Sequence, residues 1–177
     1  MPPPDDTLTP DGLRERIAAA LASGVPHGLA TFRSTRLPEV RHDKGAGVAE
    51  KLLHQLAAIL RGAARPGDVV GRVDDDTVGV LLNASASESQ NAVGRLAHAT
   101  REGSRWPVAT GHAHSEGHSG GAEALLRRAL EASREVVADA AVEDEKSDSA
   151  LAVRFQRLSL LNRMSLELFS EKPFPQA

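Results

Sequence analysis

Cysteine and tyrosine are absent from this chain of 177 residues, tryptophan occurs once, and aromatic residues make up 3% of it. Without cysteine the chain can form no disulfide, bind no metal through thiolates and use no thiol nucleophile. The scarcity of aromatic rings leaves few platforms on which nucleic-acid bases could stack. No apolar run approaches the ~20 residues that cross a bilayer, and residues 1–6 lack both the cationic and the apolar region of a secretory signal. These absences predict a cytoplasmic protein that neither inserts into a membrane nor binds nucleic acid.

The residues that are present have the balance of a globular protein. Hydrophobic residues make up 41% of the chain and charged residues 25%, with a formal net charge of −3 and no basic half. This charge balance offers little general attraction for nucleic acid or for an anionic membrane. The length suits one domain with an appendage, because such a chain can bury about 70% of the surface that it exposes when unfolded.

The most informative stretch is the turn Arg65-Pro66-Gly67-Asp68. Pro followed by Gly suits the two central positions of a type II turn, which brings the first and fourth residues together. An arginine can donate two hydrogen bonds to the O6 and N7 edge of guanine, and a carboxylate can accept one from a base N–H. The turn could therefore bind a guanine. Alternatively, Arg65 and Asp68 form only a surface ion pair with each other, worth ~0–1 kcal/mol.

Hydrophobic periodicity and turn residues predict alternating helices and strands. A β-hairpin is expected at 68–82, where two β-branched runs flank an acidic turn. Helices are expected over 10–22, 47–61, 86–102 and 121–138, and strands over 28–32 and 105–113. This order suits an α/β (α+β) domain in which helices cover a mixed central sheet.

The hairpin resembles the signature of the GGDEF domain family, the diguanylate cyclases. In that family an Arg-x-x-Asp turn is followed, about five residues later, by Gly-Gly-Asp/Glu-Glu-Phe. The corresponding residues here are Asp74-Asp75-Asp76-Thr77-Val78, so only the middle acid matches. Weaker matches occur in the family's order at 6–17, 41–50, 108–113 and 125–130. The resemblance implies a GGDEF domain over residues 5–142, with the palm-like fold of the nucleotide cyclases, in a bacterial signalling protein.

The resemblance also implies that the catalytic positions have been lost. Arg33 stands where the family has a metal-binding carboxylate, Pro38 where it has a phosphate-binding lysine, and Arg41 where an asparagine reads the substrate guanine. Asp74 and Asp75 replace two glycines that let the backbone approach phosphates closely. Asp76 remains as a possible ligand, and Glu50 is a conservative replacement of a family acid. Since hard divalent cations need oxygen ligands, we expect no cyclase activity, no catalytic residues and no bound metal.

The product-binding positions of the family are retained by comparison. There the Arg-x-x-Asp pair binds cyclic di-GMP with a second arginine from the helix after the hairpin. The matching residues are Arg65, Asp68 and Arg95. The resemblance therefore implies an inactive GGDEF domain that needs no cofactor and acts as a cyclic di-GMP receptor through protein contacts. The alternative is a ligand-free scaffold or interaction module that works through its C-terminal helix.

A histidine-rich stretch offers a candidate metal site. His112 and His114 would share one side of a strand, and His118 follows in a run that reads as a flexible loop. Because no fixed fourth ligand is evident, the spacing does not change the expectation of no metal.

The chain changes character after the domain. Residues 143–149 lack apolar side chains and predict a linker. Residues 150–170 then predict an amphipathic helix whose apolar residues exceed a single stripe. Exposed apolar residues in this number would be a solubility liability, so the helix must pack somewhere. It could dock on its own domain, or residues 151–169 could bind a protein partner or a second copy of the chain.

Overall fold

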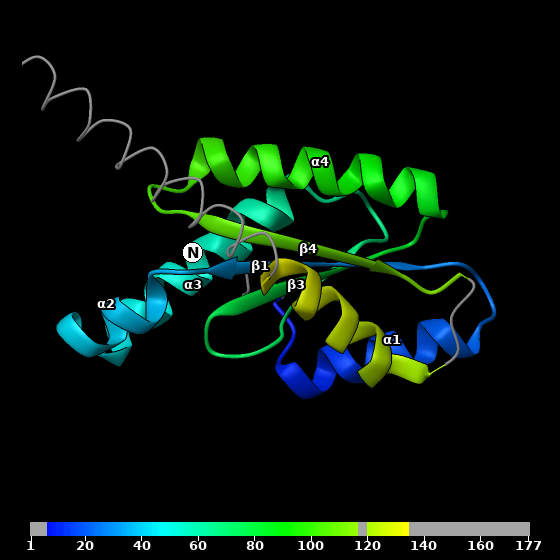
Figure 1. Cartoon of the computed structure of the whole chain (residues 1–177), viewed down its shortest axis with the longest axis horizontal. Coiled ribbons are helices and arrows are strands. Elements are labelled where there is room, and N and C mark those ends of the chain that lie inside the picture. Colours follow the sequence, from blue (N-terminus) through cyan, green and yellow to red (C-terminus); the bar gives the residue numbers. More distant parts are fainter. Residues whose placement is uncertain (1–6, 117–119, 135–177) are drawn as a thin grey trace, which may run out of the picture. The chain divides into compact units, whose positions relative to one another are not determined.

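The computed structural model describes residues 7–116 and 120–134. Its elements follow one another as shown in Figure 1: α1 (Pro10–Ala22), β1 (Gly28–Ser34), α2 (Leu37–Lys44), α3 (Ala46–Ala63), β2 (Val69–Arg72), β3 (Thr77–Leu82), α4 (Ala86–Gly103) and β4 (Val108–His114). A further helix covers residues 121–134. The linker expected at 143–149 and the helix expected at 150–170 lie outside the described residues.

The four strands form one sheet in the order β2-β3-β1-β4. Each neighbouring pair is antiparallel, with Thr31 opposite Gly79 on one side and Gly111 on the other. The α/β fold class is thus confirmed, whereas the expected mixed pairing is reduced to one isolated parallel bridge between Leu8 and Gly71. The helices do connect parallel strands, β1 to β2 and β3 to β4. In each case, however, a third strand lies between the two, so no parallel strands are neighbours.

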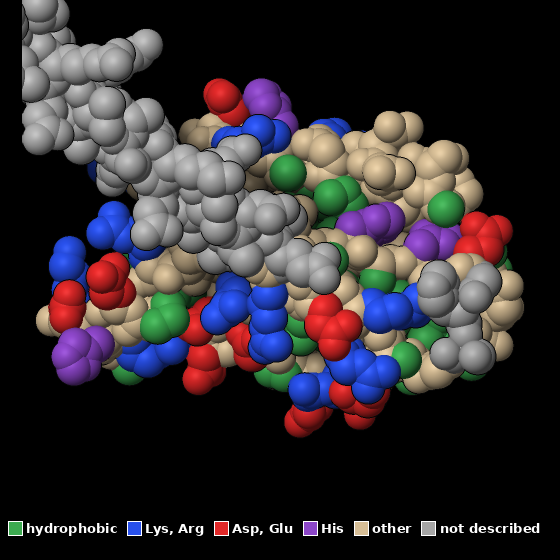
Figure 2. Space-filling model, in the orientation of Figure 1, with side chains coloured by type: hydrophobic (Ala, Val, Ile, Leu, Met, Phe, Trp, Pro, Cys, Tyr) green, Lys and Arg blue, Asp and Glu red, His purple; other side chains and the backbone are tan. Residues whose placement is uncertain are grey.

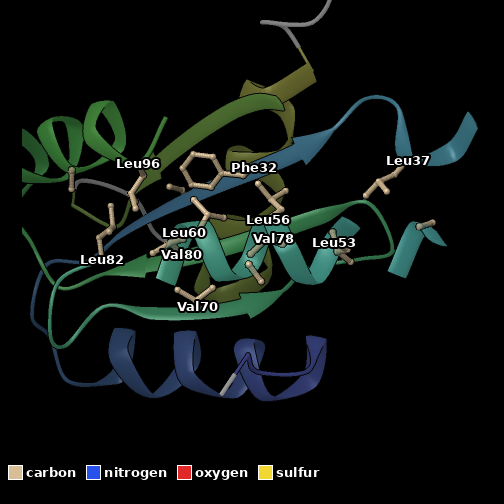
Figure 3. Close-up of a cluster of buried hydrophobic side chains, with 14 residues drawn as sticks. Phe32, Leu37, Leu53, Leu56, Leu60, Val70, Val78, Val80, Leu82 and Leu96 are labelled. Carbon is tan, nitrogen blue, oxygen red and sulfur yellow. The ribbon is translucent and has the colours of Figure 1, made fainter. Parts of the chain in front are cut away.

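Side chains on the two faces of the sheet build two hydrophobic clusters. Successive residues of a strand point to opposite faces, so Ala30 and Phe32 of β1 enter one cluster and Leu29 enters the other. The first cluster lies between the sheet and helices α3 and α4 and includes Leu56, which is completely buried (Figure 3). The second is covered by α1 and by the helix over 121–134. Figure 1 shows α4 and α1 on opposite sides of the sheet.

Glycine at position 111 is required by the close approach of the last described helix. A Cβ atom there would lie 2.0 Å from the carbonyl oxygen of Ala129 and 2.5 Å from the amide nitrogen of Ser133. The hydroxyl of Thr31 also donates to the Ala129 carbonyl at 2.9 Å. The helix over 121–134 therefore packs directly against the Gly111 backbone of β4 and is hydrogen-bonded by the Thr31 side chain of β1.

Helix α2 was not expected from the sequence. Its eight residues include Pro38 in the first turn, a position that proline tolerates because the N–H there needs no helical partner. Leu37 is buried, and the polar residues that follow are largely exposed. Within residues 7–116 and 120–134, no helix is long and apolar enough to cross a membrane.

Candidate functional site

The turn at residues 65–68 has the expected geometry. The amide of Asp68 donates to the carbonyl oxygen of Arg65 at 3.0 Å, which closes the turn. Gly67 has a φ of +97°, in the left-handed region that favours glycine. The carboxylate of Asp68 accepts from the backbone N–H of Arg65 at 2.9 Å. The two side chains therefore form no ion pair with each other, and Arg65 makes none with any other described residue.

A cavity of about 650 Å³ lies beside this turn. Its wall includes Arg65 and Asp68 from the turn, Arg16 from α1 and Arg61 from the last turn of α3. A volume of this size is within the range of about 300–1,000 Å³ that is typical of small-molecule sites. Arg16 and Arg61 were not singled out from the sequence, because nothing local indicates that α1 and the end of α3 meet at this turn.

Arg95 lies next to the chain that leads into the turn. Its Nε donates to the carbonyl oxygen of Ala63 at 3.2 Å, and its buried Nη2 has no hydrogen-bond partner among the described residues. The side chain is half-buried and does not line the cavity. The structure thus brings Arg65 and Asp68 together and places Arg95 behind them, at the end of α3.

The positive charge of Arg65 influences Glu88, in the first turn of α4. Glu88 accepts hydrogen bonds from the hydroxyl of Ser85 at 2.6 Å and from its backbone N–H at 3.0 Å. These bonds lower the pKa of the Glu88 carboxyl, and the Arg65 guanidinium lowers it further. Arg65 is therefore an exposed residue that lines the cavity and also acts electrostatically on the first turn of α4.

The tip of the hairpin is held by arginine. Arg41 of α2 donates to the carboxylate of Asp76 at 3.0 Å and to the carbonyl oxygen of Asp75 at 2.7 Å. The amide of Asp76 donates to the carboxylate of Asp74 at 2.8 Å, so a side chain closes the turn where the family has glycines. Three of the predicted former catalytic positions, Arg41, Asp75 and Asp76, therefore contact one another.

A second arginine engages the remaining acid. Arg72 of β2 forms ion pairs with Glu50 of α3 and, at 3.7 Å, with Asp75. His54 also lies 3.3 Å from the Glu50 carboxylate. Sequence reasoning missed Arg72; its only signal is that it is the one charged residue in an otherwise apolar strand. Both acids that could have served as ligands, Asp76 and Glu50, thus have an arginine partner.

The other positions that were expected to have lost a catalytic role, Arg33 and Pro38, form no hydrogen bond or ion pair with this network among the described residues. Arg33 lies on β1 opposite Thr77, and the amide of the next residue, Ser34, donates to the carbonyl oxygen of Asp76 at 3.0 Å. Pro38 is exposed in the first turn of α2.

Across the face seen in Figure 2, basic side chains are interspersed with acidic ones along the lower edge and form no continuous basic patch there.

The histidines of β4 lie apart from both sites. His114 hydrogen-bonds through Nε2 to the carbonyl oxygen of Ala84 at 3.0 Å. Burial lowers the pKa of His112, and the nearby His114 lowers it further. No group of three metal-binding side chains occurs among residues 7–116 and 120–134, and His118 lies outside the described residues.

Comparison with known families identifies the class of this domain. The family model described as "Diguanylate cyclase, GGDEF domain" matches residues 8–149. The chain therefore belongs to the GGDEF family. None of the curated protein sequences matches it.

Solved GGDEF domains share the fold. The GGDEF domain of YfiN from Pseudomonas aeruginosa is 22% identical, with a TM-score of 0.64 over 73% of this chain and 89% of that one. The FimX GGDEF domain from the same organism is 20% identical, with a TM-score of 0.64 over 75% and 90% of the two chains. The GGDEF domain of DgcB from Caulobacter crescentus, solved in complex with c-di-GMP, is 14% identical, with a TM-score of 0.62 over 73% and 84%.

Proposed function

We propose that this GGDEF domain is catalytically inactive and works as a cyclic di-GMP receptor through Arg65 and Asp68, with Arg95 in support. One observation carries the proposal: Asp76 at the hairpin tip and Glu50 of α3 are neutralised by Arg41 and Arg72, whereas the Arg65 guanidinium beside the cavity has no ion-pair partner among the described residues. The first site is closed by the chain's own charges, and the second is open to a ligand.

The chemistry of the tip argues against catalysis. Joining two GTP molecules requires divalent cations that neutralise phosphate charge and activate a hydroxyl. At the tip, a guanidinium lies 3.0 Å from the Asp76 carboxylate, in the space where such a cation would need to bind. A second cation there would be repelled by Arg41, and a metal would have to displace a charge-assisted hydrogen bond. Arg33 adds a further positive charge on the strand that should supply a carboxylate.

The chemistry of the turn favours guanine binding. The Arg65 guanidinium is exposed and can present two parallel N–H donors to O6 and N7 of the base. Asp68 is held by the backbone of the same turn, so its carboxylate is already ordered before a ligand arrives. Preordered groups reduce the entropy that binding must overcome. Similar GGDEF domains have been solved with c-di-GMP, including one described as a novel interaction mode.

Calorimetric titration of the full chain with cyclic di-GMP tests the receptor role. Losing a bidentate contact between arginine and guanine costs ~1–3 kcal/mol, so Arg65→Ala should weaken binding at least about fivefold. Arg33→Ala, a change of equal charge at the former catalytic strand, should leave the affinity unchanged. Absence of binding to the unsubstituted protein at high micromolar ligand would instead favour the ligand-free interaction module.

An assay of GTP turnover tests the loss of catalysis. We expect no cyclic di-GMP from the purified chain with either Mg²⁺ or Mn²⁺, because Asp76 and Glu50 are both paired with arginine. Product that appears with the unsubstituted chain and disappears with Asp76→Ala would contradict this part of the proposal.

A receptor without catalysis must pass its signal on by contact. Ligand binding counts as a signal only where it changes the affinity for something else. The apolar residues within 151–169 are our proposed contact surface for a protein partner or a second copy, on the basis of their sequence pattern.

A further inference from the structure

The wall of the cavity away from the turn carries two arginines of its own. Arg16 projects from α1 and is exposed, and it makes no hydrogen bond or ion pair with any described residue. Arg14, two residues earlier on the same helix, behaves differently. It pairs with Asp11 at 3.3 Å and with Glu123 at 3.2 Å and does not line the cavity. The unpaired arginine of α1 is thus the one that reaches this space.

Arg61, the second of these arginines, is held in place by a hydrogen bond to Thr7. It is half-buried in the last turn of α3, and its guanidinium donates to the hydroxyl of Thr7, which precedes α1. Its position is therefore set by the segment that leads into α1. Arg16, Arg61 and Arg65 line one cavity, and Asp68 is the only acid among the described residues that line it.

This local excess of positive charge is unusual for the chain, which carries a net charge of −3. Cations collected around one concave space raise the local concentration of anions and repel one another until an anion is bound. The planar guanidinium group matches phosphate oxygens with two parallel hydrogen bonds, which the ammonium of lysine cannot do. The chemistry of this wall is therefore that of a phosphate site.

Building on the proposed function, we infer that Arg16 and Arg61 bind a phosphodiester of cyclic di-GMP while Arg65 and Asp68 bind one of its guanines. Two elements remote in sequence, α1 and the end of α3, would then recognise the anionic part of the ligand. The turn recognises the base. The same cavity holds the arginines for a phosphodiester and the turn residues for a guanine. It therefore selects for a nucleotide that carries a phosphodiester next to a guanine.

The test compares Arg16→Ala with Arg14→Ala in the full chain, by titration with cyclic di-GMP. Both changes remove one positive charge from α1, but only the first removes a cavity side chain. We expect Arg16→Ala to weaken binding about tenfold, equivalent to ~1.4 kcal/mol, and Arg14→Ala to change it less than twofold. Arg16→Lys should recover part of the loss, because the charge returns without the planar fork.

Salt dependence separates a phosphate contact from a structural effect. Added salt screens charge interactions over a Debye length of about 10 Å at 0.1 M. Affinity of the unsubstituted chain should therefore fall with added NaCl more steeply than that of Arg16→Ala. Unfolding midpoints in urea should be the same for the two proteins, since Arg16 makes no contact that folding requires.

The outcomes distinguish this inference from the proposed function. If Arg65→Ala weakens binding while Arg16→Ala matches Arg14→Ala, the phosphodiester inference is overturned and the receptor role stands. Equal losses for Arg16→Ala and Arg14→Ala would show a long-range charge effect and also overturn it. If the unsubstituted chain does not bind cyclic di-GMP, both the receptor role and the inference are refuted.

Discussion

Removing Arg41, the α2 arginine that pairs with Asp76 at the hairpin tip, should show how much this ion pair stabilises the fold. In a metal-dependent cyclase the tip acid is neutralised by a bound cation, whereas here Arg41 performs the neutralisation within the folded chain. On this interpretation, the ion pair between Arg41 and Asp76 contributes to folding stability even without ligand. A double-mutant cycle with Arg41→Ala and Asp76→Asn measures this contribution directly.

The expected magnitude follows from burial and geometry. The side chains of Arg41 and Asp76 are 32% and 19% exposed, and the two charged groups are 3.0 Å apart. Exposed ion pairs contribute about 0.2–1 kcal/mol, and breaking a fully buried pair costs about 3–5 kcal/mol. An intermediate coupling energy of about 1–2 kcal/mol is expected. Arg41→Ala alone should cost somewhat more, because the hydrogen bond to the Asp75 carbonyl is lost as well.

Urea unfolding of the four proteins in the cycle provides the assay, provided that the slope m stays constant. Arg36 and Glu39 of the α2 region form a matched control pair, with a longer separation of 3.6 Å and exposures of 63% and 68%. Their cycle should give about 0.5 kcal/mol or less. Equal coupling energies in the two cycles would refute the reasoning, since Arg41 would then be only a surface partner of Asp76.

Three further predictions concern the fold, its pH dependence and the C-terminal segment. In urea unfolding, Gly111→Ala should destabilise the domain by more than about 3 kcal/mol, because the new Cβ atom would clash with the backbone of Ala129. Gly94→Ala in helix α4 is the control: its Cβ atom would have no neighbour within 4 Å, so it should stabilise the domain by about 0.5–1 kcal/mol. The lowered pKa of His112 means that the unfolded chain takes up its proton first as the pH falls below about 6.5, so folding stability declines there, and His112→Gln should reduce the decline between pH 7 and pH 5. Deleting residues 150–177 should abolish partner binding or self-association in sedimentation measurements but change cyclic di-GMP affinity only a few-fold; an insoluble product would place that helix in the core.

Local signals in the sequence predicted most elements accurately. The helix expected over 10–22 begins and ends at those residues, since Pro10 follows the N-cap Thr9, whose hydroxyl accepts from the amide of Gly12. The Pro-Gly pair predicted the closed turn because proline fixes its own φ and glycine permits a positive φ, whatever the rest of the fold. Helix α2 was missed because eight mostly polar residues carry no clear apolar stripe.

Contacts between distant segments could not be predicted in the same way. The antiparallel pairing depends on which strand lies between two others, and no local pattern encodes that choice. Arg72 was overlooked because its partners, Glu50 and Asp75, come from a helix and a loop that the fold brings together. Arg16 and Arg61 were overlooked for the same reason, since their shared cavity exists only after α1 has packed beside the turn.

The closed tip and the open turn belong to one hairpin, and this gives the proposed loss of catalysis a physical consequence. The strand β2 lies between the two sites and, with four residues at ~3.3 Å each, is about 13 Å long. A tip that depended on a metal or a substrate would leave the hairpin less constrained whenever they were absent. Arg41 and Arg72 instead hold the tip to α2 and α3 permanently. In the proposed receptor, the same charges that exclude a catalytic cation therefore keep the turn ordered, so binding free energy need not be spent on ordering it.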